Sequence, residues 1–285
     1  MFAQTSGTTG KPKFIPVTPT DQGRANKDQM RTWLYHAQKA HPGILDYKVV
    51  SMVSPAIEGY TESGLPFGST SGHIYKHMPG LVRRAYSVPY EVFEIEEYQA
   101  KYYTIMRVSL EHDVHFLATA NPSSIIQLMD KANEYGEDMI RDIRDGTLSS
   151  RQDIEPGIRQ AVEKRLRPNP KRAAQLDAMR ARRDGRLLPG DYWPGLGLIG
   201  CWKGGTVGHY LEKFDPWFNP DGARAVPVRD WGYLSSEARG SIPLSDEGSK
   251  GVLTVAANFF EFVAADEVEV RPDDPESWPF LTAAD

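Results

Sequence analysis

The residues best suited to chemistry stand at the start of the chain, where hydroxyl side chains alternate with glycines and lysines. The run reads Thr5-Ser6-Gly7-Thr8-Thr9-Gly10-Lys11-Pro12-Lys13. Glycine lets backbone N–H groups approach a ligand, and successive N–H groups form an anion-binding nest. Hydroxyl donors and a lysine charge suit a polyphosphate. A polar turn is the alternative interpretation, but an extended apolar segment, residues 14–18, follows directly. The run therefore predicts a phosphate-binding loop at a sheet edge.

A second group of chemically capable residues lies more than 200 residues downstream. It reads Asp230-Trp231-Gly232-Tyr233-Leu234-Ser235-Ser236-Glu237. The pattern Y-x-x-S-E is weak by itself, because a serine and a glutamate at a strand end often only cap local backbone. Its position after the first run, in this order, adds weight to a shared site.

A third stretch combines Tyr192-Trp193-Pro194 with a strand that runs into Cys201-Trp202-Lys203-Gly204-Gly205. In α/β folds, ligands bind at the carboxyl ends of strands, where such small-residue turns occur. The Gly204-Gly205 turn is therefore a candidate ligand contact.

The first run resembles the phosphate-binding motif of the adenylate-forming superfamily. Its continuation, TSGTTGKPKFIPVT, is closer to one branch, the GH3 acyl acid–amido synthetases, which also use Y-x-x-S-E. The W-P pair, the glycine turn and Asn258-Phe259-Phe260-Glu261-Phe262 resemble that family more loosely. Together these matches cover nearly the whole chain.

The resemblance implies a role for each matching position. Lys11 is implied as the catalytic charge, with Ser6, Thr8 and Thr9 as further phosphate ligands. Tyr233 is expected against the adenine, Ser236 on the α-phosphate and Glu237 on Mg²⁺, which prefers carboxylates together with phosphate oxygens. Gly204 and Gly205 are assigned to the acid pocket. The implied ATP-binding set is Thr5, Ser6, Gly7, Thr8, Thr9, Gly10, Lys11, Tyr233, Ser236 and Glu237.

The implied activity is that of an ATP- and Mg²⁺-dependent acid–amino acid ligase. A small carboxylic acid is activated as acyl-AMP and passed to an amino acid. An acyl-CoA ligase of the phenylacetate type is one alternative, although the FIPVT continuation and Y-x-x-S-E favour the GH3 branch. A non-catalytic nucleotide-binding fragment is the other.

The elements that must position these residues alternate between strand and helix. Short joints between them predict parallel crossovers, hence an α/β fold with mixed, mainly parallel sheets and flanking helices. Strands are expected near residues 47–53, 114–120, 196–202 and 224–228, with a late strand or hairpin at 252–263. Helices are expected near residues 19–40, 90–111, 121–144 and 206–218, and a long irregular connection at 56–89.

Residues 151–189 differ in charge, with eleven basic and five acidic side chains. Pro168-Asn169-Pro170 separates two expected helices. A nucleic-acid surface is the alternative interpretation. A solvated helical pair is favoured, because base-stacking aromatic residues are absent from this stretch and GH3-like proteins also have a helical segment here.

Composition limits the class of protein. The 285 residues, 40% hydrophobic and 25% charged, are typical of a soluble globular protein. A net charge of -5 gives no global basic field for nucleic acid. One cysteine, Cys201, excludes a disulfide framework within the chain. No apolar run approaches the ~18 residues of a membrane span, and Met1-Phe2-Ala3-Gln4 carries no signal-peptide pattern. A cytoplasmic protein without membrane or nucleic-acid partners is expected.

Competing sites are poorly supported. The pairs His112/His115 and His73/His77 lack further ligands for zinc, so structural or solvated histidines are expected. By resemblance, residues 1–285 are the central part of the large ATP- and acid-binding domain, with residues 151–189 within it. The large N-terminal domain of adenylate-forming enzymes is expected to be incomplete at both ends, a fragment without the mobile C-terminal domain.

Overall fold

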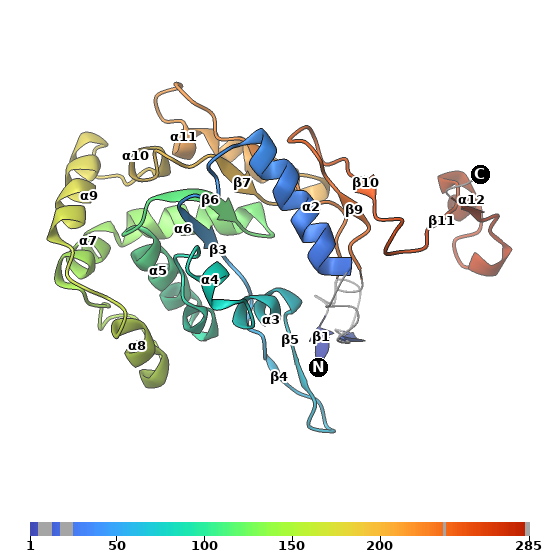
Figure 1. Ribbon diagram of the computed structural model, residues 1–285, viewed down its shortest axis with the longest axis horizontal. Helices are drawn as coiled ribbons and strands as arrows, with labels where there is room; N and C mark the ends of the chain where they lie inside the picture. The colour runs from blue at the N-terminus through green and yellow to red at the C-terminus, as the bar shows by residue number, and fades with distance from the viewer. Residues whose placement is uncertain (5–12, 18–24, 236–237, 283–285) are drawn as a thin grey trace.

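A parallel sheet of four strands lies at the centre of the molecule (Figure 1). The computed structural model describes residues 1–4, 13–17, 25–235 and 238–282. Each strand of this sheet pairs in parallel with its neighbour in the sheet. In sheet order they are β3 (Lys48–Ser51), β6 (Val114–Ala118), β7 (Leu198–Gly200) and β8 (Val228–Arg229). The four strands expected from the apolar runs are confirmed.

Alternate residues of these strands enter two separate cores, as the two-residue period of a strand requires. Val50, Leu117 and Ile199 pack in the larger core with α5 (Tyr98–Ser109) and α6 (Pro122–Glu134). Val49, Phe116 and Leu198 face the smaller core, where Trp33 of α2 (Ala25–Ala40) is fully buried. Helices therefore cover both faces, and α2 crosses the sheet in the view of Figure 1.

A second, mixed sheet has the order β2-β1-β5-β4. In β1 (Phe2–Gln4), Ala3 pairs with Ile15 of the antiparallel strand β2 (Phe14–Pro16) and with Gly68 of the parallel strand β5 (Pro66–Gly68). The short strand β4 (Gly59–Tyr60) completes it. The apolar segment after the proposed phosphate loop is extended as expected and forms the edge strand β2, whereas residues 5–12 of the loop lie outside the described residues.

The expectation of a long irregular connection at residues 56–89 is wrong. This stretch contains β4, β5, α3 (Thr70–Lys76) and α4 (Gly80–Arg83). Ser69 caps α3 by accepting a hydrogen bond from the Gly72 backbone N–H at 3.2 Å. A Cβ on Gly72 would lie 2.1 Å from the Ser54 carbonyl oxygen, so this glycine serves close packing. Glycine and serine here build short elements rather than an irregular loop.

Each helix expected beyond residue 90 is present but divided. The first consists of η1 (Tyr90–Glu94) and α5, and the Glu97 carboxylate caps α5. The second consists of α6 and α7 (Gly136–Asp145), and Gly146, with a φ of 70°, ends it as expected. The third consists of η2 (Gly205–Lys213) and α11 (Asp215–Phe218). For α2, the expected start at Pro19 lies outside the described residues.

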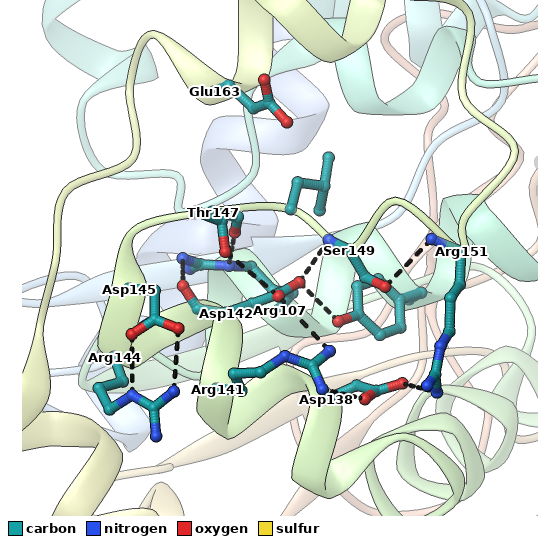
Figure 2. Close-up of polar contacts among 12 residues, drawn as sticks. Arg107, Asp138, Arg141, Asp142, Arg144, Asp145, Thr147, Ser149, Arg151 and Glu163 are labelled. Atoms are coloured by element: carbon teal, nitrogen blue, oxygen red, sulfur yellow. Dashed lines mark hydrogen bonds and ion pairs between the residues drawn. The ribbon is translucent and has the colours of Figure 1, made fainter.

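The charged segment forms the expected helical pair, α8 (Pro156–Glu163) and α9 (Pro170–Arg182), followed by α10 (Pro189–Tyr192). Figure 2 shows the buried polar network beside it. Arg107 donates to the Asp142 and Thr147 carbonyls at 2.7 and 2.9 Å. The Asp142 carboxylate accepts from Ser149 N at 2.6 Å, and Arg159 donates to the Ser149 carbonyl at 3.1 Å. Arg107 of α5 and Arg159 of α8 thus donate hydrogen bonds to backbone carbonyls between Asp142 and Ser149.

The late strand or hairpin expected at residues 252–263 is only partly confirmed. Strand β10 (Val252–Leu253) pairs with β9 (Ser241–Ile242), and β11 (Glu261–Phe262) pairs with β12 (Leu281–Thr282). The two strands therefore have separate partners. Between β11 and β12 lie α12 (Ala265–Val270) and η3 (Pro275–Ser277), far from the central sheet in Figure 1. Among the described helices, none has the length and hydropathy to cross a membrane.

Candidate functional site

Segments that follow three neighbouring strands meet at the carboxyl edge of the parallel sheet. Trp202 N donates to the Ala120 carbonyl at 3.0 Å, which links the chain after β7 to the chain after β6. Cys201 N donates to the Arg229 carbonyl at 3.2 Å, which links it to β8. Parallel α/β sheets bind ligands at this edge, because all their strands end there together.

The carboxylate of Asp230 joins two of these segments. Asp230 is buried, with only 3% of its surface exposed. Oδ2 accepts the backbone N–H of Lys203 at 2.5 Å, and Oδ1 accepts that of Gly232, also at 2.5 Å. The Asp230 carbonyl accepts the indole N–H of Trp33 at 2.8 Å. Since hydrogen bonds to an ionised acceptor are short and strong, Asp230 holds the ends of β7 and β8 at a set spacing.

Tyr233 presents its ring to solvent at this edge. Gly232 turns the chain with a φ of 85°, and a Cβ there would lie 2.4 Å from the Ser241 carbonyl oxygen, so the turn requires glycine. Beyond it, the Tyr233 backbone N–H donates to Ser241 Oγ at 2.9 Å. Tyr233 is 74% exposed although its backbone is held on both sides, since its carbonyl accepts from Gly240 N at 2.7 Å. An ordered backbone with an exposed ring suits a flat ligand.

The other residues of Y-x-x-S-E, Ser236 and Glu237, lie outside the described residues. Their neighbours on each side are in contact, because Ser235 N donates to the Ala238 carbonyl at 2.9 Å. Leu234 and Arg239 form an antiparallel bridge. The two arms that flank Ser236 and Glu237 therefore pair directly after Tyr233.

The Gly204-Gly205 turn lies at the same edge, one residue after Lys203. Gly205 is exposed with a φ of 64°, and no neighbouring atom lies within 4 Å of a Cβ built on it. Gly204 is tighter, since its Cβ would lie 3.0 Å from Ser249 Oγ. The open backbone of Gly205 can be approached closely by a ligand.

Residues Thr5, Ser6, Gly7, Thr8, Thr9, Gly10 and Lys11 lie outside the described residues. The strands on either side of this run pair antiparallel, with Gln4 opposite Phe14. Of the residues named from the sequence, Tyr233, Gly204 and Gly205 lie within the described residues, each a few positions after a strand of the parallel sheet.

Sequence reasoning assigned no role to a charged cluster on the side of β8. The Asp246 carboxylate accepts from Arg229 Nε at 2.5 Å and contacts His41 Nε2 at 2.5 Å. Burial alone would raise the pKa of Asp246, but the hydrogen bonds from Arg229 and His41 hold it below its usual value. Lys203 Nζ donates to the Val228 carbonyl at 3.0 Å and also contacts the Asp246 carbonyl. This cluster supports the ends of β7 and β8.

Sequence reasoning also assigned no role to Asp230, although it belongs to the second group of residues. The only local indication of its role is that a carboxylate directly follows an expected strand. Its partner Lys203 is 27 positions away in the sequence, so their pairing follows from the sheet order rather than from a local pattern.

The histidine pairs have structural contacts. The His115 ring stacks on Tyr47 at 4.1 Å between centroids. Burial, together with Lys48, Arg172 and Arg107, lowers the pKa of His112 to about 4. The His73 and His77 rings, at the C-terminal end of α3, are tilted against each other at 4.2 Å between centroids. In the described parts of the chain, no group of three or more His, Cys, Asp or Glu residues is placed to hold a metal ion.

Comparison with known proteins places this geometry in a family. The family model described as "GH3 family N-terminal domain" matches residues 1–222. Oryza sativa subsp. japonica has a similar protein, the probable indole-3-acetic acid-amido synthetase GH3.11, 27% identical over 93% of this chain and 46% of the relative. The jasmonoyl–L-amino acid synthetase JAR6 of Nicotiana attenuata is 25% identical over 90% of this chain and 45% of the relative.

The fold also matches solved structures. The AtGH3.15 acyl acid amido synthetase in complex with 2,4-DB aligns with a TM-score of 0.77 at 19% identity, over 93% of this chain and 47% of that one. This likeness confirms the predicted α/β class with mixed, mainly parallel sheets. The chain spans slightly less than half the length of the relatives named here. On the family model and these relatives, the chain belongs to the GH3 family.

Proposed function

We propose that this chain carries the ATP- and acid-binding site of an acid–amino acid ligase. The observation that carries the proposal is the Asp230 clasp, which we define as the Asp230 carboxylate with its two backbone donors, Lys203 N–H and Gly232 N–H. It joins the segment that leads to the exposed Tyr233 ring to the segment that leads to the open Gly205 backbone, at one sheet edge of a GH3-family chain.

In the proposed reaction, a carboxylate oxygen of the acid attacks the α-phosphorus of ATP and pyrophosphate leaves. The amino group of an amino acid then attacks the acyl carbon, loses a proton and displaces AMP. The names of the relatives, amido synthetases for indole-3-acetic acid and for jasmonate, support amide formation by a chain of this family.

The residues of the chain divide this work. Tyr233 offers a flat ring to the adenine at small entropic cost. Gly204 and Gly205 leave room for the acid next to the α-phosphate. Lys11 and the hydroxyls of Ser6, Thr8 and Thr9 are assigned to the phosphates, whose charge they stabilise as pyrophosphate leaves.

Ser236 is assigned to the α-phosphate and Glu237 to Mg²⁺. One carboxylate beside phosphate oxygens is the donor set that Mg²⁺ prefers. Bound there, the ion supplies charge stabilisation to the phosphates. We also propose that residues 151–189 are a helical part of the same domain, and that the protein works in the cytoplasm.

ATP–pyrophosphate exchange by the protein as its gene encodes it tests this proposal. A panel of aryl and alkyl carboxylic acids is assayed, and each acid that supports exchange is then incubated with amino acids or with coenzyme A. Acid-dependent exchange followed by amide formation is expected. A thioester product instead assigns the acyl-CoA ligase alternative, and nucleotide binding without exchange for any acid assigns a non-catalytic fragment.

A further inference from the structure

Arg239 is a buried arginine without a carboxylate partner in the described parts of the chain. The residue is 4% exposed, and among the described residues its Nη1 atom, like those of Arg107 and Arg229, has no hydrogen-bond partner. Burial lowers the pKa of the guanidinium, and no neighbouring acid opposes that effect. An isolated charge is costly to bury, and proteins normally pair it. Arg239 therefore needs an explanation.

Two other arginines are buried to a similar degree, and each meets a carboxylate. Arg107, 0% exposed, lies 2.7 Å from Glu111. Arg229, 1% exposed, lies 2.5 Å from Asp246. In both structural arginines, the buried guanidinium is therefore paired with a carboxylate. Among the described residues, Arg239 differs from these two arginines because it has no carboxylate partner.

The backbone of Arg239 is held in place beside the candidate site. Its carbonyl accepts hydrogen bonds from Thr254 Oγ1 at 2.7 Å and Asn258 Nδ2 at 2.8 Å. Across the short ladder, Arg239 pairs with Leu234. Cross-strand partners share a face, so Arg239 lies on the face opposite to Tyr233, whose ring would contact a Cβ on Gly240 at 2.6 Å. Only one residue separates Arg239 from Glu237 in the sequence.

We propose that Arg239 binds an oxyanion of a substrate of this site, either the carboxylate of the acid or the phosphate of the nucleotide. Both present two oxygens in one plane, which the guanidinium fork binds in a bidentate manner. The anion supplies the partner that the guanidinium lacks among the described residues. This inference rests on the proposed function for the identity of the substrates, but the burial of Arg239 without a carboxylate partner among the described residues does not depend on that function.

The test compares thermal melting of the wild-type chain with that of Arg239→Met, which keeps volume but removes the charge. Four probes are used: benzoate, its neutral isostere benzamide, AMP, and its uncharged counterpart adenosine. Benzoate or AMP is expected to raise the melting temperature of wild type above the effect of its neutral counterpart. In Arg239→Met, the affinity for that anion is expected to fall by about 10- to 100-fold, as the loss of a charge-assisted hydrogen bond implies.

The ligand-free melting temperature gives a second, independent readout. Arg239→Met is expected to melt at the wild-type temperature or above it, because removing an unpaired buried charge relieves its desolvation cost. Arg229→Met is the matched control. It leaves Asp246 without its arginine and is expected to melt at a lower temperature.

Each outcome decides between the alternatives. A response to benzoate that is lost in Arg239→Met assigns the acid carboxylate, and one to AMP alone assigns the phosphate. Lowered ligand-free melting in Arg239→Met with all probe responses intact overturns the inference and leaves the proposed function standing. An Arg239-dependent anion response without any adenosine response supports the inference while the adenine role of Tyr233 fails. No response of wild type to any probe overturns both.

Discussion

The Asp230 carboxylate accepts the backbone N–H of Lys203 at 2.5 Å, across two strand ends that are 27 positions apart in the sequence. The same carboxylate accepts Gly232 N–H at 2.5 Å, one residue before Tyr233. Lys203 in turn precedes the Gly204-Gly205 turn. One buried acid thus sets the distance between the proposed adenine ring platform and the proposed acid pocket.

Asp230→Asn tests this clasp. The amide keeps one acceptor oxygen but turns an N–H₂ group toward a backbone donor, so one hydrogen bond is lost. The expected cost is about 1.5–3 kcal/mol in the free energy of unfolding. Pyrophosphate exchange is expected to fall by about 10- to 100-fold, because small displacements of reacting groups lower rates steeply.

Chemical denaturation and ATP–pyrophosphate exchange measure the two effects. Asp266→Asn, an exposed carboxylate on α12, is the matched control and is expected to change neither. Stability loss in Asp230→Asn with exchange unchanged, at a temperature where the variant is folded, would reject a positioning role for the clasp.

Lys11→Ala tests the phosphate loop. Loss of a cation that stabilises the departing pyrophosphate is expected to lower exchange by about 10² or more. The melting temperature without ligand is expected to stay within a degree or two of wild type, because a lysine whose role is to bind the phosphates of a ligand contributes little to the stability of the ligand-free protein. Lys39→Ala, at an exposed position near the end of α2, controls for charge removal. Equal exchange by the two variants would rule out the assignment of Lys11.

Glu237→Gln tests the magnesium assignment, because glutamine keeps the shape of glutamate and removes its charge. If Glu237 binds Mg²⁺, ligand-free melting is expected to be unchanged, and the rise in melting temperature with ATP and Mg²⁺ to disappear. A purely structural glutamate would show the reverse, with about 1 kcal/mol or more lost from the ligand-free protein and the ATP-dependent rise retained.

How far the sequence predicts the fold depends on where the determining contacts lie. The helix expected from residue 121 does start there, where local contacts cap it: Asn121 Oδ1 accepts Ser123 N at 2.9 Å. Strand β5 was missed because its partner is distant, with Phe67 opposite Phe2. A strand of three residues has no period to detect, and only its pairing defines it.

The same distinction applies to the candidate site. Tyr233 and the glycine turn were placed correctly at strand ends, since parallel strands end at one edge. The Asp230 clasp and the unpaired charge of Arg239 leave no local pattern. Burial and hydrogen-bond partners from other strands create both, so they could be found only in the folded chain.

His112 is expected to make the stability of the folded chain depend on pH. Its pKa is lowered to about 4, first by burial and then by Lys48, Arg172 and Arg107, whereas an unfolded histidine titrates near ~6.5. Between these values the unfolded chain binds more protons than the folded one. The stability that the neutral imidazole contributes is therefore complete above about pH 6.5 and falls as the pH drops toward 4, by about 1.4 kcal/mol per pH unit at most.

Urea denaturation at half-unit steps from pH 4 to pH 7.5 measures this slope. His112→Gln is expected to flatten it across that window, whereas the exposed control His209→Gln is expected to keep it. Burial raises the pKa of the Asp246 carboxylate, but the hydrogen bonds from Arg229 and His41 hold it below its usual value. Its contribution starts to fall as the pH approaches the ordinary carboxylate pKa of ~3.9, and this loss is common to all three proteins, so the comparison of slopes isolates His112. An unchanged slope in His112→Gln would show that folding does not lower the pKa of His112.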